Sequence, residues 1–406
     1  MRSAISALAN PQSWLIETLG GGQVKSGVRV NEWTAMQSTA VFACVRILAE
    51  SVASLPLPVY ERLQGGGKQR APNHPLYRVL HDMPNPEMTS FAFRETMMAH
   101  VLLWGNAYAE IERDGAGRIV ALWPLLPDRT QVYRNMQTLQ LEYLTVLPDG
   151  RQIILPAFQV LHIPGLGFNG IVGHSPIRMA REAVGLALAT EEFGARFFGN
   201  GAQLNGVLEH PGKLGDTAHK NLRESFDEKY SGLSQSHRVM ILEEGMKYNR
   251  IGIPPEDAQF LQTRKFQIAE IARLYRVPLH MLQDLERATN NNIEHQSLEF
   301  VVHSLRPWLV RWEQAILSKL LTPQEQDIYF AEFLVDGLLR GDIKSRYDAY
   351  AVGRQNGWLS ADDIREMENM NPLPDGKGKI YLVNGNMVPT DQAGQQTQTG
   401  QQTQTG

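Results

Sequence analysis

The chain has almost no cysteine, since Cys44 is the only one among its 406 residues. A single cysteine cannot form an internal disulfide, which excludes a disulfide-stabilised secreted fold and is typical of a protein that folds in a reducing compartment. Cys44 lies in the apolar run STAVFACVRILAE. We therefore expect its thiol to be a small buried side chain rather than a nucleophile.

Long hydrophobic runs are also missing. The run AVGLALA, residues 183–189, is far shorter than the ~20 residues that span a membrane. The N-terminal stretch MRSAISALANPQSW is interrupted by Asn10-Pro11 before an apolar signal core develops. The sequence thus predicts neither an export signal nor a membrane anchor.

An excess of positive charge is absent as well. The formal net charge is −4, with 43% hydrophobic and 20% charged residues. This profile is that of a globular protein and does not indicate tight nucleic-acid binding. With 406 residues, the chain is long enough for two or three domains.

Motifs for catalysis and cofactor binding are missing or fail in detail. The 11 histidines show no H-E-x-x-H and no metal spacing. GVLEHPGKL departs from a phosphate-binding loop because Leu214 stands where a hydroxyl would hold magnesium. GLGFNG, Gly165–Gly170, matches the dinucleotide pattern, but the next helix begins only at Ser175, so we interpret the motif as a loop. His162 is expected to be a hydrogen-bonded core residue and His174 part of a structural loop. We expect no enzyme activity, no cofactor and no metal.

The first half of the chain predicts a mixed α+β region with antiparallel strands. Apolar periodicity indicates helices from about Thr34 to Ser54 and from about Ser90 to Trp104. Between them, LPLPVYERLQGGGKQRAP predicts a strand that runs into a glycine turn. Two hairpins follow, one turning at Asp114–Gly117 and the other at Pro148–Arg151.

The second half predicts mostly helices. Ser175-Pro176 is an N-cap followed by a first-turn proline, and it opens a helix that ends at Gly199–Gly201. A βαβ insertion of about fifty residues precedes a second long helix, from about Pro255 to Tyr275. A third helix, from about Asn292 to Leu321, is expected to kink at Pro307.

The C-terminal part predicts a small helical unit. Its first helix stops at Gly357, and its second is capped by Ser360 with Asp363 at the capping-box position. The end of the chain repeats QQTQTG twice, a polar, low-complexity sequence that we expect to be disordered.

Three consecutive asparagines separate two of these helices in the stretch QDLERATNNNIEHQS: Asn290, Asn291 and Asn292. Asparagine is a poor helix former because its side chain competes for backbone hydrogen bonds. The run therefore predicts a break between the helices.

Several stretches, taken in order, resemble the phage portal protein family, the head–tail connectors of tailed bacteriophages. They are AVFACVRILAESVASLPLPVYER, HPLYRVLHDMPNPEMTSFAFRETMMAHVLLWGNAYAEIERD, GHSPIRMAREAVGLALATEEFGARFFGNGA, LQTRKFQIAEIARLYRVPLHML and NNNIEHQSLEFVVHSLRPWL. The resemblance extends over roughly Ala40 to Asn371. Taken singly, the short motifs GNAY, FFGNGA and EIARLYRVP are weak signals of the family. Their occurrence in the family's order makes the resemblance specific.

The resemblance implies an α+β portal fold with an α/β wing, long stem helices, a small α/β clip, a kinked long helix with a tunnel loop, and a helical crown. Carried over by position, these parts are residues 31–174 and 322–340 for the wing, 175–202 and 255–282 for the stem, 203–254 for the clip, 283–321 for the tunnel loop and kinked helix, and 341–384 for the crown. Residues 1–30 are expected to be partly disordered, and residues 385–406 form the disordered tail.

The resemblance also implies a function. Portal proteins form a ring, a dodecamer in the virion, through which double-stranded DNA is packaged and ejected at one capsid vertex. The implied partners are DNA without sequence preference, the large terminase, which docks mainly at the clip, the major capsid protein and a head-completion or adaptor protein. The protein is then expected in the virion, after assembly in the host cytoplasm.

By position, LERATNNN falls at the tunnel loop that leans into the channel. The amides of the three asparagines can donate and accept hydrogen bonds without a charge, whereas every added cation would increase the affinity for phosphate. The residues expected to contact DNA from this loop are Arg287, Thr289, Asn290, Asn291 and Asn292. Arg264 and Lys265 are candidates on the stem. A flexible, solvated connection between two helices is the alternative interpretation of the loop.

Two other functions stay open. One is a nucleotide-cofactor-binding oxidoreductase that would use GLGFNG, and the other is a capsid-associated adaptor without a DNA channel. A portal predicts a large ring with a central hole in electron micrographs and no cofactor absorbance. Whether terminase or capsid protein copurifies with the chain would distinguish the adaptor from the other two functions.

Overall fold

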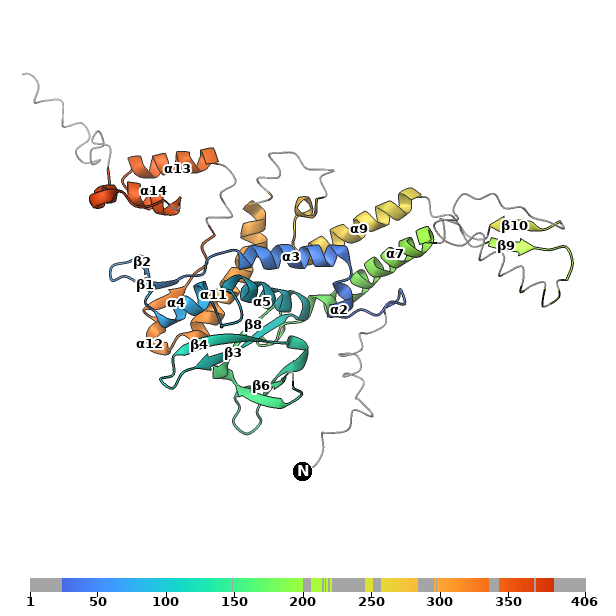
Figure 1. Cartoon of the computed structure of the whole chain (residues 1–406), viewed down its shortest axis with the longest axis horizontal. Coiled ribbons are helices and arrows are strands. Elements are labelled where there is room, and N and C mark those ends of the chain that lie inside the picture. The colour runs from blue at the N-terminus through green and yellow to red at the C-terminus, as the bar shows by residue number, and fades with distance from the viewer. Residues whose placement is uncertain are drawn as a thin grey trace, which may run out of the picture. The chain divides into compact units, whose positions relative to one another are not determined.

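The computed structural model describes residues 24–147, 149–199, 206–213, 215, 217, 220, 245–250, 257–283, 296, 298–335, 343–368 and 370–382. The chain divides into two compact units, Met1–Leu334 and Val335–Gly406, and each is described by itself (Figure 1). Helices and antiparallel sheets both occur in the first unit, which confirms the predicted α+β class.

Four helices open the first unit: α2 (Glu32–Ala35), α3 (Thr39–Ala53), α4 (Pro75–His81) and α5 (Ser90–Trp104). α5 has the predicted bounds and ends at Gly105, whose φ is 76°. The helix predicted from about Thr34 to Ser54 is instead two helices. Asn31 and Thr34 form a capping box at the start of α2, and a second N-cap, Ser38, starts α3. Periodicity alone predicts one helix start, whereas the structure has two, and only the first has side-chain capping hydrogen bonds.

α3 and α5 pack against each other through their apolar stripes. Cys44 lies fully buried in the stripe of α3, as predicted. The buried Arg94 of α5 donates from Nε and Nη2 to the carbonyl of Ala53 and from Nη1 to that of Leu80. Arg94 thereby pairs carbonyls at the C-terminal ends of α3 and α4 that have no partner within their own helices.

Two antiparallel sheets follow. The first contains β3 (Asn106–Arg113), β4 (Ile119–Leu125) and β8 (Val160–Pro164), in the order β4-β3-β8. The second contains β5 (Thr130–Arg134), β6 (Leu141–Val146) and β7 (Gln152–Pro156), in the order β5-β6-β7. Both predicted hairpins are confirmed, because they connect β3 to β4 and β6 to β7. In the first turn, Asp114 Oδ1 accepts hydrogen bonds from the N–H groups of Ala116 and Arg118, at 2.9 Å each.

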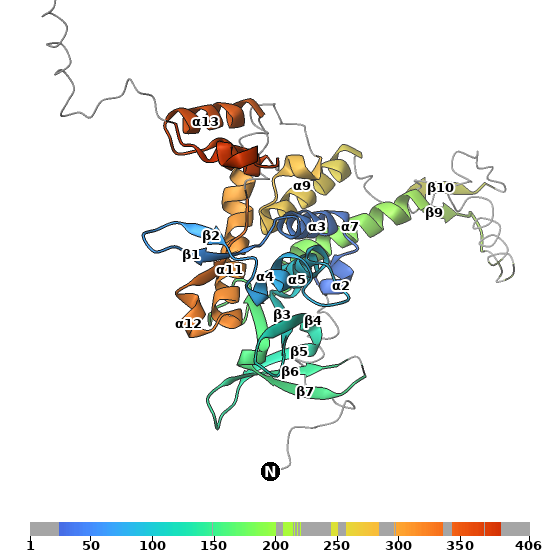
Figure 2. The same ribbon diagram turned by 60° about the vertical axis from the view of Figure 1, so that its left-hand side comes forward.

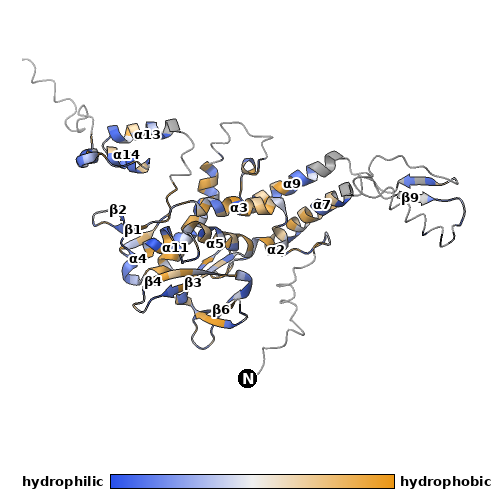
Figure 3. Ribbon diagram, in the orientation of Figure 1, coloured by the Kyte–Doolittle hydropathy of each residue, from blue (hydrophilic) through white to orange (hydrophobic). Residues whose placement is uncertain are grey.

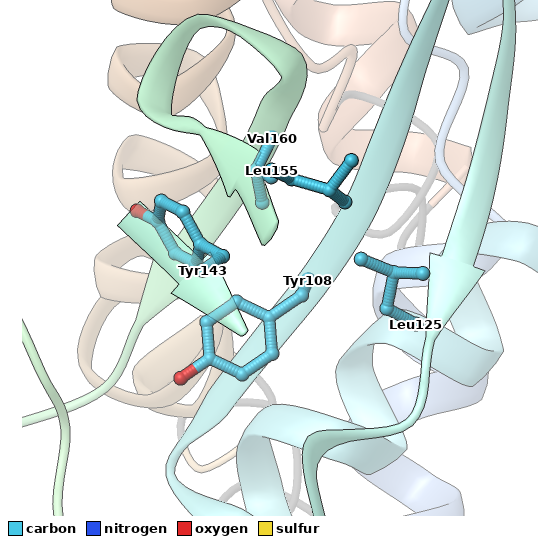
Figure 4. Close-up of a cluster of buried hydrophobic side chains, with 5 residues drawn as sticks. All are labelled: Tyr108, Leu125, Tyr143, Leu155 and Val160. Atoms are coloured by element: carbon cyan, nitrogen blue, oxygen red, sulfur yellow. The ribbon is translucent and has the colours of Figure 1, made fainter. Parts of the chain in front are cut away.

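The two sheets meet in a cluster of buried side chains (Figures 2 and 4). The cluster consists of Tyr108, Leu125, Tyr143, Leu155 and Val160. The first half of β3 is buried on both faces. The reason is that the second sheet covers Tyr108 while α5 also contacts the strand.

The chain returns to this core late in the sequence. α11 (Arg306–Leu320) packs along β8, and its Trp312 is buried with ring centroids 6.3 Å from those of both Phe93 and Phe333. After the short α12 (Pro323–Gln326), β11 (Tyr329–Ala331) joins β1 (Val59–Arg62) and β2 (Lys68–Arg70) in a sheet of order β11-β1-β2. The strand and glycine turn predicted before residue 70 are therefore one hairpin of this sheet.

A pair of long helices continues the first unit. α7 (Arg181–Gly199) and α9 (Asp257–Tyr275) lie side by side (Figures 1 and 2). Ser175 caps the preceding α6 (Pro176–Met179), as predicted, by accepting a hydrogen bond from the N–H of Arg178. The single helix predicted from Ser175 is interrupted at Ala180, where φ is −105° and ψ is 25°.

Only the strands of the predicted insertion are described in full. β9 (Gly206–Glu209) and β10 (Lys247–Arg250) pair in the antiparallel sense. Most of the helix predicted between them lies outside the described residues.

The second unit contains α13 (Ile343–Gln355) and α14 (Ala361–Met367), which are more hydrophilic than α3 and α7 (Figure 3). The capping box predicted for Ser360 and Asp363 is present. Arg346 and Tyr350 of α13 both donate to the carboxylate of Glu368, at 3.1 and 2.9 Å. Polar contacts, more than a large apolar core, therefore connect the two helices. Over the described residues of both units, we find no helix with the length and apolar character of a membrane span.

Candidate functional site

The helix α9 ends in a reversal that leads toward the predicted tunnel loop. Arg276 has a φ of 56°, and Pro278 cannot continue the helical hydrogen bonding. The chain then forms the short helix η4 (Leu279–Leu282), after which Gln283 has a φ of 62°. Two left-handed residues thus redirect the chain before the loop.

The loop candidates themselves lie outside the residues that the structure describes: Arg287, Thr289, Asn290, Asn291 and Asn292. The structure gives only the two ends of this segment, at Gln283 and Gln296. Contact of the five candidates with DNA therefore stays a prediction.

Beyond the loop, the described chain resumes at Gln296 and enters the π-helix η5 (Phe300–Leu305), which continues directly into α11. Pro307 has no N–H to donate, and its ring crowds the carbonyl four residues earlier. A π-turn at this point accommodates both effects, because its wider turn shifts the hydrogen-bonding pattern. Regular α-helix, with Pro307 in its first turn, therefore begins only after the π-helix η5.

Two hydrogen bonds join the ends of the loop. His280 Nδ1 lies 2.7 Å from Gln296 Oε1, which requires the Nδ1–H tautomer because an amide oxygen only accepts. Ser304 Oγ donates to the carbonyl of Arg276 at 2.5 Å. We call these four residues the loop base. Sequence reasoning missed both contacts, because polar residues 16 and 28 positions apart leave no local signal of pairing.

The stem candidates Arg264 and Lys265 lie on an unusually open part of α9. Residues 262–266 are all exposed, and Phe266 among them is 56% exposed. Along a helix, Arg264 and Arg276 are about 18 Å apart. The structure therefore places the two stem candidates together but separates them from the loop base.

Two buried polar groups lie next to this open stretch. Ser38 and Gln267 line a cavity of about 20 Å³ between α3, α7 and α9, which Arg264 also lines. Ser38 Oγ and Gln267 Oε1 have no hydrogen-bond partner within the described part of the chain. A cavity of this size can hold about one water molecule. Neither group carries a signal in the sequence, where each resembles an ordinary polar residue of a helix.

The glycine motif of residues 165–170 is a loop, as predicted. Gly173, just after it, packs backbone to backbone, since a Cβ there would lie 2.1 Å from the carbonyl oxygen of Gly105. The Asn106 side chain accepts from the N–H of Gly173 and donates to its carbonyl, at 2.8 Å each. The preceding strand β8 belongs to an antiparallel sheet and α6 begins only at Pro176, so the dinucleotide interpretation is wrong.

His162 is a hydrogen-bonded core residue, as predicted. Its Nε2 lies 3.1 Å from Asn106 Oδ1 and its Nδ1 lies 3.1 Å from the Tyr143 hydroxyl. Burial, with a smaller contribution from the positive charge of Lys319, lowers the pKa of His162 to about 3. The imidazole is therefore neutral, donating from Nε2–H and accepting at Nδ1. Together with Asn106 it links both sheets to the loop.

Candidate metal ligands do not gather in the described residues, where no group of three or more His, Cys, Asp or Glu side chains could hold an ion. The predicted absence of enzyme activity is not tested by this observation.

Comparison with known proteins gives a consistent result. The family described as phage portal protein matches residues 39–369. The probable portal protein of Streptomyces phage phiC31 is 38% identical over 381 residues, which cover 90% of this chain and 82% of that protein. The portal protein of Enterobacteria phage HK97 is 34% identical over 369 residues, covering 90% and 86%.

Solved structures share the fold. A chain of a native gene transfer agent virion matches with a TM-score of 0.57 and 21% identity, over 89% of this chain and 99% of that one. A chain from the neck of a native gene transfer agent particle computed with C12 symmetry matches with a TM-score of 0.56 at 21% identity, over 89% and 99%. An HK97-family phage portal protein from Corynebacterium diphtheriae matches with a TM-score of 0.57 at 17% identity, over 76% and 96%.

Proposed function

The chain belongs to the phage portal protein family, and from that premise we propose that copies of it close into a ring-shaped channel for double-stranded DNA at one capsid vertex. The observation that carries the proposal is the family match over residues 39–369. Two named portal proteins that are 38% and 34% identical along 90% of this chain support it. Because a chain of the same fold belongs to a neck with C12 symmetry, we take twelve as the number of copies in the virion.

The parts of the chain then have separate roles. The helix pair α7–α9 serves as the stem and β9–β10 belongs to the clip, whereas residues 31–174 and 322–340 form the wing and residues 341–384 the crown. The open stretch of α9 at residues 262–266 supports a stem whose packing is completed by something outside the chain.

Contact with DNA is proposed for the tunnel loop and for Arg264 and Lys265. The loop base fixes where residues 284–295 leave and rejoin the core, so the loop would be presented at a defined position. Uncharged amides at Asn290, Asn291 and Asn292 would exchange hydrogen bonds between phosphates and water, while the few cations would limit the affinity for DNA. This balance suits a duplex that has to move.

Partners follow from the same role. We propose that the large terminase docks mainly at the clip, that the major capsid protein surrounds the ring, and that a head-completion protein joins it. The protein would assemble in the host cytoplasm and remain in the virion.

Negative-stain electron microscopy of the purified full chain tests the channel. Ring-shaped particles with a central hole are expected. Compact monomers or dimers alone, at high concentration and with capsid protein present, would overturn the proposal. Oligomers that lack a through-hole would favour the adaptor without a DNA channel.

The tunnel loop needs its own test. Replacing Asn290, Asn291 and Asn292 together by alanine should change the packaging rate or the packaged genome length, measured with terminase and empty capsids. An unchanged rate and length would leave the channel in place but remove the loop from its function.

A further inference from the structure

A cleft of about 580 Å³ lies between α6, the first turn of α7 and the C-terminal half of α9. It is lined by residues 178–184 and by Glu270, Ile271, Arg273 and Leu274. Val184 and Ile271 provide an apolar floor, being 0% and 1% exposed, and Met179 at the margin is 65% exposed. The volume is that of a site for several side chains.

The chain arrives at this cleft from its N-terminal end. A Cβ on Gly185 would lie 2.4 Å from Cγ2 of Val24, so Val24 packs directly on α7 at a position that only glycine allows. The N–H of Lys25 donates to Glu182 Oε2 at 3.2 Å. These contacts fix the end of the N-terminal segment within one turn of the residues that line the cleft.

The segment that precedes Val24 carries apolar residues within reach of the cleft. Trp14, Leu15, Ile16 and Leu19 lie in the stretch SWLIETL, which three glycines separate from Gln23. An extended chain spans up to about 3.5 Å per residue, so Leu19 can lie up to about 18 Å from Val24. Residues 178–184 extend over only about 9 Å along a helix.

Charge also fits this occupant. Arg178 of the cleft is paired with Glu32, at 3.0 Å. For Arg181 and Arg273, by contrast, no side-chain hydrogen bond or ion pair occurs within the described ranges. The segment offers one carboxylate among its apolar residues, that of Glu17. The lining also holds two carboxylates, Glu270 and Glu182, of which Glu182 accepts from the N–H of Lys25, against three arginines.

We propose that residues 14–19 of the N-terminal segment dock in this cleft of the same chain, with their apolar side chains over Val184 and Ile271 and Glu17 beside Arg181 and Arg273. The docked segment would brace α7 against α9 where the two helices leave the core. This inference concerns one chain and does not depend on ring formation or on a DNA channel.

Cross-linking tests the placement. Thr18→Cys combined with Met179→Cys places thiols on the segment and at the cleft margin without removing an apolar docking residue. The matched control combines Thr18→Cys with Met136→Cys, the same substitution at a methionine that is 87% exposed on the turn between β5 and β6. Cys44 is buried and its pKa is raised to about 12 by burial, so it does not compete.

With a short bis-maleimide, the cleft pair should form an intrachain product at least ~10-fold more efficiently than the control pair, because docking raises the effective concentration of the two thiols. Equal yields would overturn the proposal. A product of twice the chain mass on a denaturing gel would overturn docking within one chain.

A charge exchange tests the contact itself. Glu17→Arg should lower the yield of the cleft cross-link several-fold, and adding Arg273→Glu should restore it. Electron microscopy of the same samples reports on ring formation independently, so failure of the docking proposal is distinguishable from failure of the proposed function. An unchanged yield in Glu17→Arg would remove the charge contact, and with it the argument for this occupant.

Discussion

Helices α5 and α9 are of similar length but relate differently to the rest of the molecule. α5 buries 8 of its 15 residues, including Arg94, whose three donor contacts all reach backbone carbonyls in the core. In α9, residues 262–266 are exposed around the whole helix, and the amide oxygen of the neighbouring Gln267 is buried without a partner in the described chain. One helix completes its contacts within the chain and the other does not.

The contrast separates two kinds of structure in one subunit. Most helical stability in proteins comes from packing one face, so a helix exposed on all sides over more than a turn gains little from its own chain. The α5 region is therefore a self-sufficient core, while α9 depends on what surrounds it in the proposed ring. Substitutions in the first region should change stability, and those in the second should change assembly or DNA passage.

Trp312→Ala should have the largest effect, because it empties the centre of the self-sufficient core. Trp312 is 1% exposed and packs between Phe93 and Phe333. Large-to-small changes of this kind lower the free energy of unfolding by about 3–5 kcal/mol. Trp33→Ala is the control, since Trp33 is 62% exposed and forms an edge-to-face ring pair with Trp104. Urea unfolding should show a decrease below about 1.5 kcal/mol for this control. Equal decreases would contradict the placement of the core.

His162 should make the core sensitive to acid. Its pKa falls from the ordinary 6.5 to about 3 in the folded chain, so the folded state disfavours the protonated ring. The stabilisation is complete above pH 6.5 and is lost as pH falls from 6.5 toward 3, by up to about 4 kcal/mol. Urea unfolding of the wild type and of His162→Gln at both ends of this window measures it. The wild type should lose more stability than the variant, and parallel losses would rule out His162 as the titrating group.

Gly105→Ala probes the backbone contact that closes the core against the glycine loop. Gly105 has a φ of 76°, and a Cβ there would lie 2.2 Å from the carbonyl oxygen of His174. Strain and overlap together should cost about 2–4 kcal/mol. Gly117→Ala separates the two effects, because φ is 80° and no atom lies within 4 Å. Its cost should be about 1–2 kcal/mol from strain alone. Thermal unfolding that gives equal costs would contradict the close approach.

How much the sequence could predict differs between the two regions. Local signals are sufficient for the self-sufficient core: apolar periodicity predicts both bounds of α5, and turn residues predict both hairpins. They are insufficient inside a continuous apolar pattern, as before Thr39, where a second helix begins although Ser38 at its N-cap position makes no side-chain capping hydrogen bond. Local signals also cannot show that a second sheet buries Tyr108, since that contact depends on the packing of distant strands.

The candidate site is less predictable. Its position comes from resemblance, and the polar contacts that define it join residues far apart in sequence, such as His280 and Gln296. Arg264 and Lys265 are candidates by position, and their exposure on α9 is consistent with that choice without testing DNA contact. Periodicity and turn residues of one sequence predict helices, strands and turns, but they do not predict a site that, in the proposed ring, would be shared among copies.

His280→Ala should loosen the loop base and leave the core intact. It removes one hydrogen bond, worth about 0.5–1.5 kcal/mol, between η4 and Gln296. Local opening of η5 should become correspondingly more frequent, which hydrogen–deuterium exchange of its amides measures. His81→Ala, which removes a contact with the adjacent Asp82 and a ring contact with Tyr77, is the control and should leave exchange in η5 unchanged. Identical exchange in both variants would mean that His280 does not hold the loop base.

Arg264→Ala with Lys265→Ala should have the smallest effect on the subunit, because both residues are exposed on α9. The free energy of unfolding should change by less than about 0.5 kcal/mol. Binding of the assembled ring to duplex DNA should instead weaken equally for unrelated sequences. The slope of log Kd against log salt should fall by about 0.9 for every phosphate that the ring no longer neutralises.

Arg118→Ala is the matched removal of positive charge, on the exposed hairpin turn between β3 and β4. It should leave the salt slope unchanged if, as proposed, this turn belongs to the wing and the channel is lined by other parts of the chain. If Arg118→Ala and the double variant lowered the slope equally per charge removed, the effect would be one of net charge, and α9 would have no special relation to DNA.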